Sequence, residues 1–323
     1  RLGGAVLRLP DVLLGLRPNI DRIRRRNAGP GIIFPVRAAR NIMEIRDVLR
    51  RFEELLSLGC ADDAGRYLEE TAAEREGAGD GPAAISCCNE LTGFWRVRGR
   101  KEKSYAAAER ALALLSGNGL ENSVDYATVL LNYATAKSAF RELPEALSLY
   151  RRAEAVYREL LPASDYRFAS LYNNMAQAML KSNDVKGAAD HFAKSLSLLE
   201  KMTDVESEIA TCNTNMAFCL LAEKRLDEAR VRLERAEAIF RALPGDDPHC
   251  DSTLSCRGQL EYLLGRYAES AEAYRELASN IERRFGRSPN YAAACRNCAK
   301  ACAAAGLDPE AARYRRLAES VNK

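Results

Sequence analysis

Small and bulky residues alternate at a fixed spacing over most of this chain. In three places an alanine is followed four residues later by a bulky apolar residue and three residues after that by a small one, at 146–153, 188–195 and 229–236. The same register extended along the chain puts the first small position at Ala64, Ser104, Ala146, Ala188, Ala229, Ser270 and Ala311. The spacings are 40, 42, 42, 41, 41 and 41 residues. A period this constant indicates a chain built from sequence repeats.

Each repeat has the pattern of two antiparallel helices. Another small residue lies twelve positions before the first, at Ala134, Ala176 and Ala217. Two packed helices approach closely only where small side chains cross, and bulky neighbours fill the grooves between successive pairs. Turn residues fall between the two small positions, as at 182–184 and 306–309, and helix breakers separate the repeats at 117–119, 162–165, 244–248 and 288–290. The predicted fold is an all-α solenoid, a right-handed superhelix of about seven antiparallel helix-pair repeats.

This small–bulky–small pattern resembles the tetratricopeptide repeat over residues 45–320. The shorter form of that repeat has a period of about 34 residues. The longer period here is similar to the long-helix repeats of kinesin light chains and their bacterial relatives. The end repeats depart from the pattern, since Phe52 stands where a small residue is expected and residues 313–316 are mostly charged. Such changes suit terminal repeats, on which nothing stacks. The resemblance implies a module that holds another polypeptide.

A polar residue recurs two positions before the small residue of the first helix. Four repeats have asparagine there: Asn132, Asn174, Asn215 and Asn297. Asparagine is unfavourable inside a helix because its amide competes for backbone hydrogen bonds. The position lies roughly 200° around the helix from the packing contact, on the side that lines the concave groove of such a stack. One interpretation is that these amides bind the main chain of an extended peptide, as the resemblance also implies. The other is that they bridge neighbouring first helices without any ligand.

Further polar residues extend the predicted peptide-binding groove: Asn173, Gln177, Lys181, Gln259 and Lys300. Thr135 lies at another groove position, and Asn89, Arg96 and Arg296 occupy neighbouring faces. Cations there could pair with acidic side chains or a terminal carboxylate of the ligand. Family members that clamp a terminal carboxylate need a larger set of cations than this sequence offers, so that specificity is not expected.

The cysteines are interpreted as core residues. Cys295, Cys298 and Cys302 form a C-x2-C-x3-C pattern, which on a helix falls on one stripe. They occupy register positions that are apolar in other repeats, and no histidine lies nearby as a fourth zinc ligand. The same interpretation applies to Cys87, Cys88, Cys212 and Cys219. We therefore expect no metal and no cofactor.

The sequence predicts no catalysis. His191 and His249 are the two histidines of the chain, and neither belongs to a local Ser/His/Asp or Cys/His arrangement. A glycine-rich phosphate loop is also absent. The predicted function is a scaffold or adaptor that holds a peptide segment of a partner protein. The alternative is the peptide-responsive sensor half of a bacterial signalling or transcription regulator, with an effector domain upstream of Arg1.

Charge separates a leader from the predicted solenoid of residues 43–323. The chain carries +3, but residues 1–42 hold nine arginines against Asp11 and Asp21, which gives +7 and leaves −4 for the solenoid. Nucleic-acid binding by the solenoid is therefore not expected. The leader is predicted to be irregular: a targeting segment, the end of an upstream domain, or a non-native extension before Met43. No apolar stretch approaches the ~18 residues of a membrane span. Ten cysteines without a secretory signal predict a reducing, cytoplasmic setting.

Overall fold

The computed structural model describes residues 36–243, 247 and 249–322. These residues belong to two compact units, one that ends at Leu171 and one that begins at Tyr172. The boundary falls inside helix α8 (Tyr166–Lys181), so each unit contains one part of that helix. Within the described ranges every regular element is a helix.

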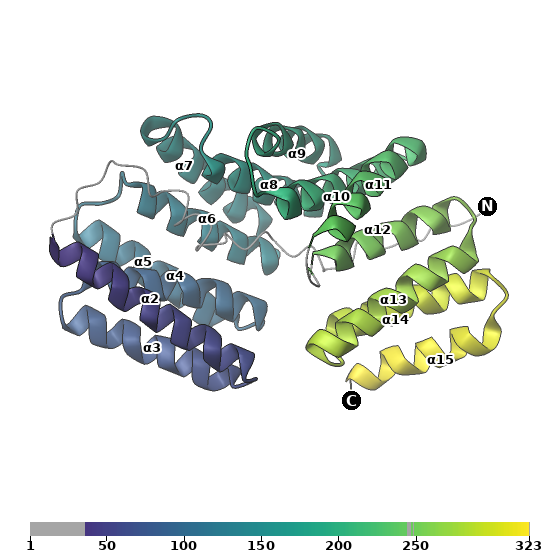
Figure 1. Cartoon of the computed structure of the whole chain (residues 1–323), viewed down its shortest axis with the longest axis horizontal. Coiled ribbons are helices and arrows are strands. Elements are labelled where there is room, and N and C mark those ends of the chain that lie inside the picture. Colours follow the sequence, from purple (N-terminus) through teal and green to yellow (C-terminus); the bar gives the residue numbers. More distant parts are fainter. Residues whose placement is uncertain (1–35, 244–246, 248, 323) are drawn as a thin grey trace. The chain divides into compact units, whose positions relative to one another are not determined.

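The N-terminal unit consists of three helix pairs and the start of α8 (Figure 1). The pairs are α2 (Val36–Ser57) with α3 (Ala61–Gly77), α4 (Gly81–Val97) with α5 (Lys101–Gly117), and α6 (Val124–Ala139) with α7 (Leu143–Leu160). The first helices of successive pairs, α2, α4 and α6, also pack on one another. This arrangement is the stacking of hairpins that the repeat predicts.

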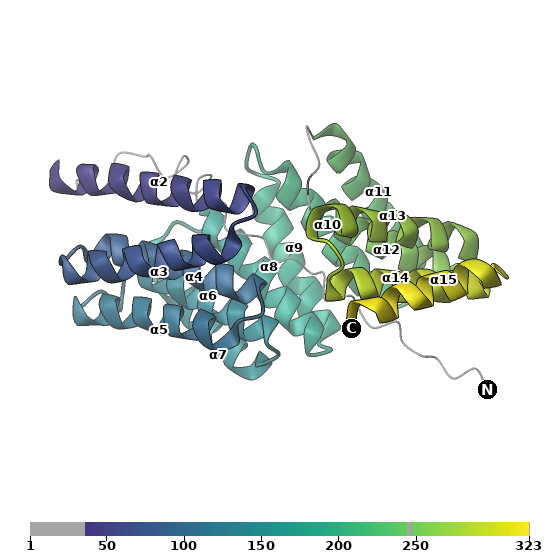
Figure 2. The ribbon, with the colours of Figure 1, turned by 90° about the horizontal axis from the view of Figure 1, so that it is seen from below.

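The C-terminal unit continues the same scheme from α8 onward. Its elements are α9 (Val185–Leu199), α10 (Glu206–Ala222), α11 (Leu226–Ala242), α12 (Cys250–Leu263), α13 (Tyr267–Phe285), α14 (Pro289–Ala304), α15 (Asp308–Glu319) and a short 3-10 helix (Ser320–Asn322). Figure 2 shows α13, α14 and α15 lying side by side. The prediction of an all-α solenoid of about seven helix pairs is thus confirmed for the described residues.

The small residues of the register lie at the closest contacts between paired helices. All seven second-helix positions, from Ala64 to Ala311, are at most 1% exposed. Where the residue is serine, its hydroxyl donates a hydrogen bond to the carbonyl of the residue twelve positions earlier in the first helix. The Oγ···O distance is 2.7 Å for Ser104 to Thr92 and also for Ser270 to Gly258. A larger side chain at these positions would force the helices apart.

The turn inside each helix pair has one recurring backbone conformation. One residue per turn has a positive φ between 60° and 77°: Gly59, Gly99, Arg141, Asn183, Lys224, Gly265 and Gly306. The N–H of the next residue bonds to a carbonyl five residues earlier, for example Arg225 to Leu220 and Arg266 to Glu261, both at 2.9 Å. This is the Schellman ending of a helix. It fixes the entry of the second helix, so the small position always follows five residues later.

The first pair differs from the prediction at its start. Helix α2 begins at Val36, before Met43, so it includes the end of the segment predicted as a leader. Residues 1–35 of that segment lie outside the described residues. Phe52 is buried where other first helices carry a small residue, and its ring packs edge-on against Phe94 with centroids 5.4 Å apart. Gly65 in α3 leaves room for the rings of Phe94 and Trp95, because an added Cβ there would lie 2.7 Å from Phe94 and 2.8 Å from Trp95.

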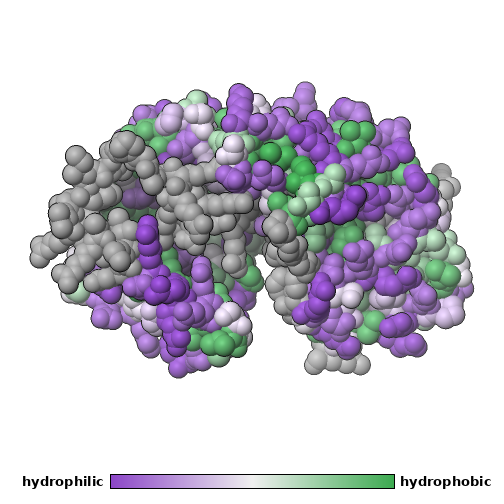
Figure 3. All heavy atoms as spheres, viewed as in Figure 1, coloured by the Kyte–Doolittle hydropathy of each residue, from purple (hydrophilic) through white to green (hydrophobic). Residues whose placement is uncertain are grey.

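The surface of the helices is mainly hydrophilic. Figure 3 shows hydrophilic residues over most of the visible described surface, with apolar residues in small groups between them. Exposed large apolar side chains such as Leu58 and Val231 lie in different units. Single exposed apolar residues are normal on folded proteins.

Candidate functional site

Buried polar side chains gather on three first helices of the C-terminal unit. We call this group the amide face, and its members are Asn173, Asn174 and Gln177 of α8, Thr214 and Asn215 of α10, and Thr253 and Ser255 of α12. Each of them is at most 4% exposed. Buried polar groups in proteins are normally hydrogen-bonded. The partners of these groups therefore decide what the face does.

Two hydrogen bonds join the three helices of the amide face. Asn215 Nδ2 donates to Asn173 Oδ1 at 3.1 Å, and the hydroxyl oxygens of Thr214 and Thr253 lie 2.9 Å apart. The N-terminal unit repeats the first of these contacts, with Asn132 Nδ2 donating to Asn89 Oδ1 at 2.8 Å. In both cases the acceptor stands one position before the asparagine register of the preceding repeat. Asn132 and Asn215 thus form the bridges between first helices that the sequence left as an alternative.

Asn174 is different from these bridging residues. It is 2% exposed, and neither its Nδ2 nor its Oδ1 has a hydrogen-bond partner within the described part of the chain. The Nδ2 of Asn173, the Nε2 of Gln177 and the Oγ of Ser255 are also buried without a partner there. Each buried polar group left unsatisfied costs about 1–3 kcal/mol. A cluster of such groups on one face is therefore a candidate site for a polar ligand.

The other predicted groove residues do not join the amide face. Asn132 lies in the N-terminal unit with Asn89. Asn297, Gln259 and Lys181 are half-buried residues of the C-terminal unit. Lys300 places its Nζ 5.0 Å from the centre of the Tyr262 ring. The predicted set is therefore divided among separate environments.

Sequence reasoning missed the hydroxyl members of the amide face. Thr214 and Thr253 link α10 to α12, and Asn213 accepts a hydrogen bond of 3.3 Å from Arg232. The available signal was the run Thr211-Cys212-Asn213-Thr214-Asn215, which is unusually polar for a helix that the register places inside the stack. Hydroxyl side chains can bond the carbonyl four residues earlier, as Thr214 does to Ala210 at 3.1 Å, so they are tolerated in a buried helix.

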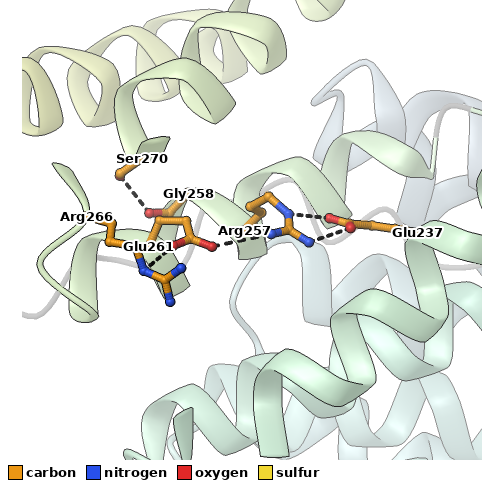
Figure 4. A network of polar contacts seen from close by, with 6 residues as sticks. All are labelled: Glu237, Arg257, Gly258, Glu261, Arg266 and Ser270. Carbon is orange, nitrogen blue, oxygen red and sulfur yellow. Dashed lines mark hydrogen bonds and ion pairs between the residues drawn. The ribbon is translucent and has the colours of Figure 1, made fainter. Parts of the chain in front are cut away.

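A charged network holds α12 in place beside the amide face (Figure 4). Arg257 pairs with Glu237 of α11 and with Glu261, and Arg266 pairs with the other oxygen of Glu261 at 3.2 Å. The hydrogen bonds that Arg257 donates to the Glu237 carboxylate raise the pKa of Arg257. The two preceding repeats have methionine at the register position of Arg257, and the following repeat has Cys298. At this junction an ion-pair network, in which the Glu261 side chain is buried and the Arg266 side chain is exposed, takes the place of an apolar contact.

Ser207, Asp247 and His249 meet at the start of α10 and α12. Ser207 Oγ donates to one oxygen of Asp247 at 2.6 Å, and His249 Nδ1 lies 2.8 Å from the other. Burial opposes the ionisation of Asp247, but the hydrogen bonds from His249 and Ser207 outweigh it and hold the pKa of this carboxyl below its usual range. Because the carboxylate stands between the serine and the imidazole, the histidine does not contact the hydroxyl. This order is not that of an activated serine nucleophile.

The seven cysteines that were predicted as core residues are all buried, whereas Cys60 is exposed and Cys250 half-buried. Cys295, Cys298 and Cys302 are fully buried, and Cys298 Sγ lies 3.6 Å from the carbonyl oxygen of Ala271. Burial raises the pKa of Cys87 and Cys212 to about 12. Neutral thiols are poor nucleophiles and poor metal ligands. Within the described ranges no group of three or more metal-ligating side chains is present.

Comparisons with known proteins agree with this helix-pair architecture. The structure entitled the apo form of RapI is 13% identical, covers 86% of this chain and 97% of its own, and has a TM-score of 0.65. A tetratricopeptide repeat protein from Parabacteroides merdae is 15% identical, covers 87% of this chain and 94% of its own, and has a TM-score of 0.55. At these identities the likeness shows the fold. The protein is therefore an α-solenoid of stacked helix hairpins.

Comparison with known sequences identifies the type of repeat. A profile of the tetratricopeptide repeat matches residues 208–277, which include most of α10, all of α11 and most of the next pair. The Arabidopsis thaliana protein named kinesin light chain-related 2 is 22% identical over 172 residues, which are 53% of this chain and 26% of that relative. Residues 208–277 therefore contain tetratricopeptide repeats. Proteins built from this repeat are generally protein-interaction scaffolds. In the described part of the chain, no helix combines the length and apolar character needed to cross a membrane.

Proposed function

We propose that this protein is an interaction scaffold whose amide face binds an extended peptide segment of a partner protein. The observation that carries the proposal is the pair of unpartnered amide atoms of Asn174, buried between neighbours that are themselves incompletely bonded. An extended peptide presents both N–H donors and C=O acceptors along its length. An asparagine amide can bond one of each at the same time.

The bridge between Asn215 and Asn173 supports this assignment. Because Asn173 Oδ1 accepts from Asn215, the Nδ2 of Asn173 is directed away from that bond and stays unpartnered. Gln177, one helical turn after Asn173, adds a second unpartnered amide nitrogen. The face then offers several donors together with the Oδ1 of Asn174 as an acceptor. Peptide main chain supplies the complementary groups without requiring a particular side chain.

The test uses peptides selected for binding to the purified protein from a random library of extended 12-residue sequences. The affinity of a selected peptide is measured by calorimetry for the wild type and for Asn174→Ala. We expect the variant to bind about tenfold or more weakly, since two hydrogen bonds to the ligand are lost. Asn280→Ala is the matched control, because Asn280 is on second helix α13 and accepts from exposed Arg283.

The outcome against the proposal is equal affinity of wild type and Asn174→Ala for every selected peptide. Circular dichroism of each variant verifies that the helices are intact. The predicted alternative, a peptide-responsive sensor half of a regulator, would use the same face. One observation would distinguish the two functions: an effector domain encoded upstream of Arg1 would favour the sensor.

A further inference from the structure

A pocket of about 570 Å³ opens in the last repeats, apart from the amide face. Its lining includes Tyr262 of α12, Arg296, Ala299, Lys300 and Ala303 of α14, and Arg315 of α15. Three of these side chains are cations, and no lining residue is acidic. The alanines have short side chains, so the cationic groups surround open space. The pocket therefore offers a positively charged cavity.

The three cations have no carboxylate partner within the described residues, although ion pairs are common elsewhere in this unit. Arg275 pairs with Glu310 at 2.8 Å, and Arg235 pairs with Glu200 at 2.8 Å. Helix α14 contains no aspartate or glutamate. Arg296 and Lys300 are spaced i,i+4 on this helix, where two like charges repel. An anion that joined this group would relieve the repulsion between its charges.

The position of Arg315 in its repeat distinguishes this group of cations from an ordinary charged surface. The residue four positions after the second-helix small residue is bulky and buried in repeats four to six, where it is Phe192, Leu233 and Tyr274. In the last repeat it is Arg315, which is exposed and lines the pocket. A polar end to a solenoid accounts for a charged residue there. It does not account for the convergence of Arg315 with Arg296 and Lys300 on one cavity.

We propose that this pocket binds a compact phosphate monoester dianion. Three cations match a group with a charge near −2, and the planar guanidinium groups of Arg296 and Arg315 suit phosphate oxygens, which they can bond in pairs. The Tyr262 ring lies 5.0 Å from Lys300 Nζ and holds that ammonium beside the cavity. The phosphate can be carried by a phosphorylated side chain of a peptide or by a small phosphorylated molecule. The proposal does not depend on peptide binding at the amide face.

The experiment follows the melting temperature of the full chain during titration with inorganic phosphate, at constant ionic strength adjusted with sodium chloride. A ligand that binds the folded state raises the melting temperature as its concentration increases. We expect this response in the wild type. In the double variant Arg296→Ala/Arg315→Ala the apparent affinity should fall about tenfold or more. Arg316→Ala is the matched control, an exposed arginine of the same helix that does not line the pocket.

A second arm identifies the source of the phosphate. A phosphoserine peptide is compared with its serine form and with free O-phosphoserine by calorimetry. Tighter binding of the phosphopeptide than of free O-phosphoserine assigns the pocket to a phosphorylated protein segment, and equal binding assigns it to a small phosphate ester. The proposal is overturned if the wild type shows no response beyond that to chloride. It is equally overturned if R296A/R315A responds like the wild type.

Discussion

Asn215 donates its Nδ2 hydrogen to Oδ1 of Asn173 across 3.1 Å, and this bond joins the first helices of two successive repeats. Asn174, the next residue along α8, occupies the asparagine register of its repeat. Neither of its amide atoms has a hydrogen-bond partner among the described residues. Two adjacent asparagines with nearly equal burial thus have opposite roles. One stabilises the stack, and the other costs stability in the unbound protein.

Replacing Asn174 by leucine is expected to stabilise the free protein. The two side chains have the same number and branching of heavy atoms, and the substitution removes buried polar atoms whose unsatisfied state costs about 1–3 kcal/mol each. The midpoint of urea unfolding should rise while binding of selected peptides is lost. A gain in stability together with a loss of binding is typical of a functional site. Reduced stability of N174L would show that the amide has a structural role instead.

Replacing Asn215 by alanine is expected to have the opposite effect. The change removes a donor and leaves Asn173 Oδ1 unsatisfied, which should lower the free energy of unfolding by about 1 kcal/mol or more. A double-mutant cycle with Asn173→Ala isolates the coupling between the two amides. The cycle for Asn89 and Asn132 is the comparison, and its coupling should be smaller because Asn132 is less buried. Zero coupling between Asn173 and Asn215 would contradict the bridge.

Replacing Lys224 by glycine is expected to stabilise the C-terminal unit. Lys224 has φ of 60° in a turn where Gly265 and Gly306 serve in later repeats. A side chain in this left-handed region costs about 1–2 kcal/mol, partly offset by the greater flexibility of glycine in the unfolded chain. We expect the free energy of unfolding, measured by thermal denaturation, to rise by a net amount of about 0.5–1 kcal/mol. Gly265→Ala is the reciprocal variant and should lose about 1 kcal/mol.

Acid should weaken the N-terminal unit through Glu142. Hydrogen bonds from Lys101 and Lys137 lower the pKa of Glu142 to about 2. The pKa of Glu142 in the folded protein thus lies below the usual glutamate value of about 4.3. The ion pairs therefore stabilise the fold fully above about pH 4.3, and this stabilisation is lost as the pH falls towards 2. Between about pH 5 and pH 2.5, a range that spans this window, the melting temperature of the wild type should therefore fall further than that of Glu142→Gln.

The size of that difference should depend on salt. The side chain of Glu142 is partly exposed, so solvent and ions screen its pairs with the two lysines. Repeating the measurement in about 1 M sodium chloride should reduce the difference between wild type and E142Q. An unchanged difference at high salt would point to a cause other than these ion pairs.

The architecture follows from residues that are close in sequence. A small residue at each helix crossing, such as Ala188 or Ser270, is required wherever two helices of a pair touch, so its period directly reports the repeat. The burial of Cys298 follows in the same way from its place in the register. The start of α2 at Val36 could not be read from this register, because the register marks crossings within a pair and the helix extends beyond them.

The sequence by itself determined the fold, the positions of its crossings and the asparagine register, because each of these depends on spacing within one repeat. It presented Asn132, Asn174, Asn215 and Asn297 as equivalent. Only the tertiary structure separated them, because the partner that satisfies an amide belongs to another repeat, 42 residues away for Asn215 and 43 for Asn132. It also placed Arg315 of α15 on the same pocket as Arg296 and Lys300 of α14, which no periodic pattern specifies.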